Sequence, residues 1–172
     1  MSDVMECLRH RRSVRKYNME PVPEAVLERV LEAARIAPSA GNAQPWKFIV
    51  VRDPDTKAQL VEACRSQQFL GRADCVIIAC GLPEKARHIG GRWSAVQVDV
   101  AAAFTQLLLQ ADAEGLGTCW IGAYEEAKVK TILGIPEEAD VLALTPLGWP
   151  DEEPAGPPRK SLDEVVCWEK WS

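Results

Sequence analysis

The loop of residues 37–46, APSAGNAQPW, constrains the fold of this chain more than any other stretch. It joins a strongly apolar predicted helix to a predicted strand. Its two prolines fix φ and remove backbone donors, and Gly41 permits a positive φ. Ser39 and Asn42 can hydrogen-bond to nearby backbone. The composition predicts a rigid loop able to hold a planar polar ligand, although an ordinary helix-to-strand turn has the same composition.

A basic segment, RRSVRKY over residues 11–17, follows a short helix predicted over residues 2–10. The planar fork of arginine matches the oxygens of a phosphate, and Ser13 adds a hydroxyl donor. Three arginines and one serine this close together suit a phosphate and a second electron-rich edge of a ligand. Surface salt bridges with nearby acids are the alternative.

The composition fits one globular domain over residues 1–172, with 47% hydrophobic residues and 26% charged residues. A net charge of -5 and a pI near 5.2 argue against a general nucleic-acid partner. The start has no basic region followed by an apolar core, and no apolar run reaches membrane-spanning length. We therefore expect neither a signal peptide nor a membrane partner.

The six cysteines form no close CxxC pair, so we expect no metal site. Several of them lie in apolar runs, where buried thiols are common. This usage indicates a reducing compartment, and we expect a cytoplasmic protein. The sequence marks no cysteine as an activated nucleophile, although it leaves a nucleophilic thiol open.

The apolar pattern predicts the remaining elements as helices over 24–37, 56–64, 93–114 and 125–133, and strands over 47–51, 75–80, 118–121 and 141–147. The run at 75–80 is continuously apolar, as in a strand covered on both faces. The helix at 93–114 is apolar almost all round, which indicates a buried helix, in the simplest case in the core of a monomer. The segment GLGTCWIG, residues 115–122, follows a helix and precedes a strand, which is the reverse of a Rossmann fingerprint.

Four segments together resemble the nitroreductase family of FMN-dependent NAD(P)H oxidoreductases. They are the Arg-Arg-Ser-x-Arg-x-Tyr segment at 11–17, Ala-Pro-Ser-x-x-Asn-x-Gln-Pro-Trp at 37–46, Gly-x-Gly-Thr-x-Trp-Ile-Gly at 115–122, and Arg-Lys-Ser-Leu-Asp-Glu-Val-Val at 159–166. Ser161 stands where the family has proline. The resemblance covers nearly the whole chain. It implies an α+β fold with a central mixed, mostly antiparallel sheet surrounded by helices, in an intertwined homodimer that holds the flavin between protomers.

The resemblance also implies roles for individual residues. Arg11, Ser13 and Arg159 would bind the FMN phosphate, and Arg15 would face N1 and O2 of the ring. Pro38, Ser39, Ala40 and Asn42, from the other protomer, would line the ring. Trp120, Ile121 and Gly122 would lie against the isoalloxazine, with the Gly122 N–H pointing at flavin N5. The expected cofactor-binding residues are Arg11, Arg12, Ser13, Arg15, Pro38, Ser39, Ala40, Asn42, Gln44, Trp120, Ile121, Gly122 and Arg159.

The expected activity follows from this resemblance. The chain has only His10 and His88, so no acid-base set can be assembled, and the flavin would supply the reactivity. We expect a two-stage reaction in which NADH or NADPH delivers hydride and then leaves. A nitroaromatic, a quinone or a similar electron-poor small molecule then accepts the electrons. The alternatives are a non-catalytic flavin carrier or sensor, or a relative specialised in deiodination or flavin cleavage.

Overall fold

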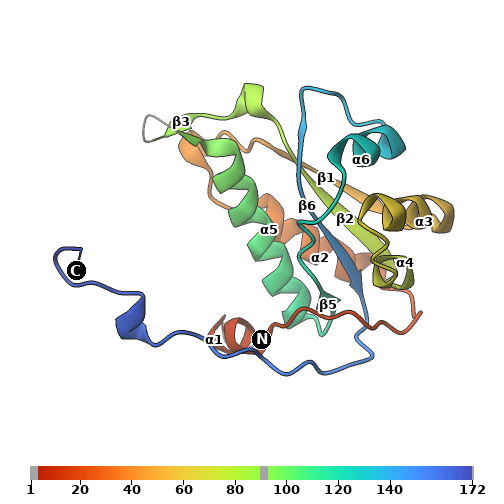
Figure 1. The fold of residues 1–172 in the computed structure, drawn as a ribbon, viewed down its shortest axis with the longest axis horizontal. Helices are drawn as coiled ribbons and strands as arrows, with labels where there is room; N and C mark the ends of the chain where they lie inside the picture. Colours follow the sequence, from red (N-terminus) through yellow and green to blue (C-terminus); the bar gives the residue numbers. More distant parts are fainter. Residues whose placement is uncertain (1–3, 90–92, 172) are drawn as a thin grey trace.

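The structure, a computed structural model, describes residues 4–89 and 93–171. Its central sheet has the order β1 (Trp46–Val51), β2 (Cys75–Gly81), β6 (Asp140–Gly148), β5 (Gly117–Thr118), and all neighbouring strands are antiparallel (Figure 1). An isolated parallel bridge between Ser13 and Thr118 extends the pairing beyond β5. The expected mixed, mostly antiparallel sheet is therefore confirmed.

Six α-helices surround this sheet in the described residues. They are α1 (Val4–His10), α2 (Glu24–Arg35), α3 (Pro54–Ala63), α4 (Phe69–Arg72), α5 (Ala95–Ala113) and α6 (Glu126–Leu133). The chain also has the 3-10 turns η1 (Ala40–Asn42), η2 (Pro83–Lys85) and η3 (Leu162–Glu164), and a two-stranded ribbon of β3 (His88–Ile89) and β4 (Trp93–Ser94).

The predicted helices are all present, and local capping explains how their ends differ from the sequence expectation. The Asp53 side chain accepts the Thr56 N–H, so α3 begins at Pro54. Ser94 caps α5, which therefore begins after residue 93. Residues 2 and 3 of the first predicted helix lie outside the described residues. The one-turn helix α4 was not predicted, because four residues give no readable helical period.

Strand β2 is buried on both faces, as its continuous apolar run predicted. Cys75, Ile77 and Ala79 belong to one hydrophobic cluster with residues of α2 and α5. The alternate residues Val76 and Ile78 belong to a second cluster with residues of α3 and α6. The sheet thus separates two helical layers, as the period-two alternation of strand side chains requires (Figure 1).

Helix α5 buries only part of its apolar surface within one chain. Val96, Val100 and Phe104 are almost fully buried in the cluster between α2 and the sheet. On the other side Val98 is 54% exposed. The expected all-round burial of this helix is therefore not reached by one chain alone. None of the helices in the described residues is long and apolar enough to cross a membrane.

The C-terminal arm runs past α1 and then leaves the body of the molecule (Figure 1). Its 3-10 turn η3 begins with a capping box, in which the Ser161 N–H and hydroxyl both donate to the Glu164 carboxylate. Proline at position 161 has neither donor, so the serine that departs from the family pattern creates this cap. The arm exposes Leu162, Val165, Trp168 and Trp171.

Lys57 is a buried cation that secures the entry to β2. Its ammonium group donates to the carbonyl oxygens of Ala73, at 2.7 Å, and Asp74, at 3.0 Å. We predict that Lys57→Met destabilises the fold by about 1–3 kcal/mol, because it keeps the apolar stem but leaves both acceptors unsatisfied. Urea unfolding measures this loss. Lys47→Met, at an exposed position of β1, is the matched control, and equal midpoints for the two variants would contradict the role of Lys57.

Candidate functional site

The basic segment is attached to the edge of the sheet by backbone pairing. The Val14 N–H donates to the Thr118 carbonyl at 2.8 Å, and the Asn18 N–H donates to the Trp149 carbonyl at 3.1 Å. Val14 and Tyr17 are buried, and the Tyr17 hydroxyl donates to the Val14 carbonyl. These two anchors hold the intervening backbone in place, so the position of the arginines is set by the sheet.

Gly117 allows this close approach. A Cβ at Gly117 would lie 2.8 Å from Val14 Cγ1, which is closer than real side chains tolerate. The glycine in the GLGT segment is therefore required by the packing of the basic segment on β5.

Three of the expected phosphate and ring-edge residues influence the thiol of Cys119. Burial raises the pKa of this thiol, and Arg15, Ser13 and Arg11 act in the opposite direction. Arg15 also donates its backbone N–H to Glu152 at 2.6 Å, and its guanidinium carbon lies 6.0 Å from the centre of the Phe69 ring.

Surface salt bridging does not explain the basic segment. The arginines that form ion pairs in the described residues are Arg29, Arg35 and Arg52, in α2 and after β1. The arginines at 11, 12 and 15 are absent from those pairs. In the described residues these guanidinium groups therefore do not form the surface salt bridges that the sequence left as the alternative.

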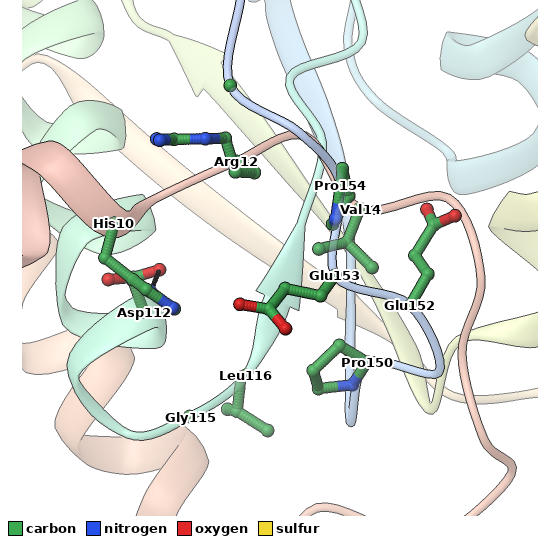
Figure 2. Close-up of a pocket in the computed structure, with 11 residues that line it drawn as sticks. His10, Arg12, Val14, Asp112, Gly115, Leu116, Pro150, Glu152, Glu153 and Pro154 are labelled. Carbon is green, nitrogen blue, oxygen red and sulfur yellow. Dashed lines mark hydrogen bonds and ion pairs between the residues drawn. The ribbon is translucent and has the colours of Figure 1, made fainter.

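Arg12 lies apart from the other three residues. Its guanidinium donates to the carbonyls of Arg9 and Arg11 and packs against Gly156 of the arm. Figure 2 shows it at a cavity of about 160 Å³, where Glu153 extends inward and His10 pairs with Asp112 at 3.0 Å. Carboxylates in this cavity disfavour a phosphate. Within one chain, Arg12 therefore contacts the arm, and its role in binding the cofactor stays a prediction.

Residues 119–122 are fixed by the central strand β6. Ile121 is buried and exchanges two backbone hydrogen bonds with Leu144, at 2.8 and 3.2 Å. Trp120 is 41% exposed and packs edge-on against Phe104, with ring centres 4.7 Å apart. A Cβ at Gly122 would meet no atom within 4 Å. The segment therefore presents an aromatic ring and an open backbone to a ligand on the same sheet edge as the basic segment.

The loop of residues 37–46 has a strained backbone that its own side chains hydrogen-bond. Gly41, Asn42 and Gln44 have φ values of 59°, 57° and 49°. For the two non-glycine residues this left-handed backbone costs about 1 kcal/mol or more each, least for asparagine. The Ser39 hydroxyl accepts the Gln44 N–H at 2.9 Å, and the Gln44 side-chain amide donates to Asn42.

One chain does not bring this loop to the basic segment. The loop is tied to the start of α5, where Asp99 accepts the Ala40 N–H. The basic segment lies at the other end of α5, where His10 contacts Asp112. Asp112 lies 13 positions after Asp99, which corresponds to about 20 Å of helix. Pro38, Ser39, Ala40, Asn42 and Gln44 thus form one group, and Arg11, Ser13, Arg15, Trp120, Ile121 and Gly122 form another.

Arg159 belongs to neither group within one chain. It is exposed on the arm and donates to the Pro157 carbonyl at 3.0 Å. Three residues earlier, Gly156 touches Arg12, so the arm does cross the basic segment before it leaves the body.

Comparison with known proteins decides the family. The sequence model of the nitroreductase family matches residues 8–80 and 65–149 of this chain. The chain belongs to the nitroreductase family. The expected family and its α+β fold are therefore confirmed.

Individual nitroreductase relatives agree with this assignment. An NADH dehydrogenase of Thermus thermophilus is 36% identical over 188 residues, which cover 92% of each chain. A nitroreductase family protein from Clostridium novyi has 32% identity and a TM-score of 0.84, covering 95% of this chain and 91% of that one. An NADPH-flavin oxidoreductase of Vibrio harveyi is 27% identical, covering 96% of this chain and 73% of that protein. Mouse iodotyrosine deiodinase 1 is also 27% identical, covering 94% of this chain and 67% of that protein.

The residues present fit FMN, the cofactor that the nitroreductase family implies. Arg11, Ser13 and Arg15 are donors suited to a phosphate and to an electron-rich ring edge. Trp120 offers an apolar surface for the ring, and Gly122 offers a backbone that no side chain covers. The arginine and serine donors suit the phosphate end of FMN. The open backbone of Gly122 suits its ring end.

Two residues near the site were missed by the sequence reasoning. Phe69 begins α4, shortly before β2, and no signal in the sequence pairs it with Arg15. Asp99 has a readable signal, because it falls on the buried stripe of α5 with Val96, Val100 and Ala103. A lone carboxylate on an apolar stripe predicts a buried partner.

The core thiols are structural in this geometry. Burial raises the pKa of Cys75 to about 12 and those of Cys64 and Cys80 to about 11. We predict that iodoacetamide at pH 8 leaves Cys64, Cys75, Cys80 and Cys119 unmodified in the folded protein, because the thiolate is the reactive form. Peptide mass spectrometry of folded and urea-unfolded protein measures this. Modification of folded Cys119 at the unfolded rate would restore the nucleophilic-thiol alternative.

Proposed function

We propose that this chain is an FMN-dependent oxidoreductase that uses NADH or NADPH to reduce nitroaromatics, quinones or similar electron-poor small molecules. The observation that carries the proposal is the pairing of Val14 with Thr118, since it sets the basic segment beside Trp120–Gly122. NAD(P)H-linked names among the relatives support the donor.

The protein's own residues would bind and orient the cofactor. FMN supplies the chemistry when bound, by taking hydride at N5 from the nicotinamide and passing electrons to the acceptor. Arg11 and Ser13 would bind the phosphate, and Arg15 would place positive charge at the N1 and O2 edge of the ring. The open backbone of Gly122 leaves the reactive edge accessible. Donor and acceptor would occupy one ring face in turn, which gives parallel double-reciprocal plots.

A homodimer completes this site. Loop 37–46 and the basic segment lie at opposite ends of α5, so a ring held between them needs the loop of a second copy. Val98 leaves part of α5 uncovered. The arm presents Leu162, Val165, Trp168 and Trp171 without a covering element of its own chain. A partner that covers these apolar groups also supplies the second half of the site.

Two alternatives remain from the sequence. Similarity to mouse iodotyrosine deiodinase supports a reductive deiodination on the same fold. A flavin carrier or sensor would bind FMN without turnover. Anaerobic assays with both nicotinamides against a quinone, a nitroaromatic and an iodotyrosine separate the three, because only the oxidoreductase consumes donor steadily with the first two acceptors.

One prediction of the proposed function concerns FMN retention. Purified protein should be yellow, and Arg11→Ala and Arg159→Ala should each weaken FMN binding by about 1.5–3 kcal/mol, the range for a lost hydrogen bond to a charged group. Flavin fluorescence titration measures the affinity. Arg35→Ala, in an exposed pair with Glu32, is the matched control. Unchanged affinity in both site variants would remove the phosphate assignment, and a colourless protein that takes up no FMN would remove the cofactor.

Another prediction tests whether the two halves of the FMN site come from different subunits. Arg11→Ala damages the basic half, and Gly41→Val damages the loop half, because a branched side chain at a φ of +59° is strained. A hybrid dimer with one variant in each subunit keeps one intact pair of halves if they come from different subunits. Tandem-affinity-purified hybrid should therefore bind about one FMN per dimer, although each parent dimer binds almost none. A hybrid that binds none places both halves in one subunit.

A further inference from the structure

Asp99 is a buried carboxylate that the proposed function does not yet use. It lies four residues after the start of α5 and is only 5% exposed. Both of its oxygens face one backbone donor, the Ala40 N–H, at 3.1 and 3.2 Å. Removing a carboxylate from water is costly, so a carboxylate retained on an apolar stripe needs a partner that matters to the fold or to the site.

The Ala40 N–H, which donates to Asp99, lies at the start of the strained part of loop 37–46. Ala40 is the first residue of η1, and the left-handed residues Gly41, Asn42 and Gln44 follow it directly. The bonds between Ser39, Asn42 and Gln44 stay within the loop and fix only its internal shape. The Asp99 contact, in contrast, joins the loop to α5 and so fixes where that shape lies.

We propose that Asp99 is the positioning residue of the flavin-ring loop. By accepting the Ala40 N–H, Asp99 holds Ser39 and Asn42 where the isoalloxazine ring binds. Asp99 affects ring binding only through this loop. The inference rests on the proposed function. The other buried charge, Lys57, binds carbonyls at the start of β2 and so offers a comparison without contact with the loop.

A positioning role for Asp99 predicts a pattern of FMN and riboflavin affinities that general destabilisation of the fold would not produce. A loosened ring loop weakens binding of the isoalloxazine, which riboflavin and FMN share, and leaves the phosphate contacts intact. Asp99→Ala should therefore raise the dissociation constants of FMN and riboflavin by the same factor, roughly three- to tenfold. Arg11→Ala should weaken FMN but not riboflavin. Asp99→Asn keeps one oxygen that accepts the Ala40 N–H and should restore most of the affinity.

The experiment combines both titrations with hydrogen exchange of the flavin-free protein, followed on the peptide that contains Ala40. Thr105→Ala, an exposed change on the same helix, is the control. The inference is supported if Asp99→Ala loses protection at Ala40 and weakens both flavins equally, while Thr105→Ala does neither. Should Asp99→Ala fail to fold, the same comparison is made with Asp99→Asn, for which a smaller but equal weakening of both flavins is expected.

Three results would overturn the inference. Unchanged protection at Ala40 would show that Asp99 does not hold the loop. Lost protection with both affinities unchanged would show that the loop does not hold the ring. Wild-type protein that binds neither flavin would remove the proposed function itself, and the exchange result would then leave Asp99 a structural residue only.

Discussion

The candidate site depends on a short series of backbone hydrogen bonds that starts at the central strand β6. Leu144 of this strand pairs with Ile121, and Thr118 of the neighbouring β5 pairs with Val14. Each step moves outward from the buried core to the sheet edge. This pairing brings together two segments that are more than a hundred residues apart in the sequence. The pairing of Val14 with Thr118 is possible because Gly117 has no side chain that would separate Val14 from the sheet.

Charge is distributed differently in the core and at the site. The buried ions Lys57 and Asp99 contact backbone groups and lie where movement would displace a strand or a loop. The arginines of α2 are instead matched with surface carboxylates. Arg11 and Arg15 fall in neither class, because they lie on the segment paired with the sheet edge and form no ion pair in the described residues. Their proposed partner is the anionic cofactor.

The sequence predicted the longer helices and strands, because periodicity and turn chemistry are local signals. The continuous run of β2 and the apolar stripe of α5 were readable for this reason. The direction of Arg12 was not readable, since it depends on where the arm crosses the chain start. The capping box at Ser161 appeared in the sequence only as a departure from the family pattern. Long-range contacts decide these features, and no local pattern encodes them.

Three unrelated features of the single chain have one common explanation. The anchors of loop 37–46 and of the basic segment lie about 20 Å apart along α5, part of that helix is uncovered, and the arm carries four exposed large apolar side chains. Burying one such side chain contributes about 1.5–3 kcal/mol, so leaving all four in water would forfeit more than a typical single mutation costs. Internal rearrangement cannot join the halves, because Asp99 and His10 fix them to opposite ends of a continuous helix. The proposed second copy of the chain would satisfy all three at once, and the cofactor site would then depend on assembly of the subunits.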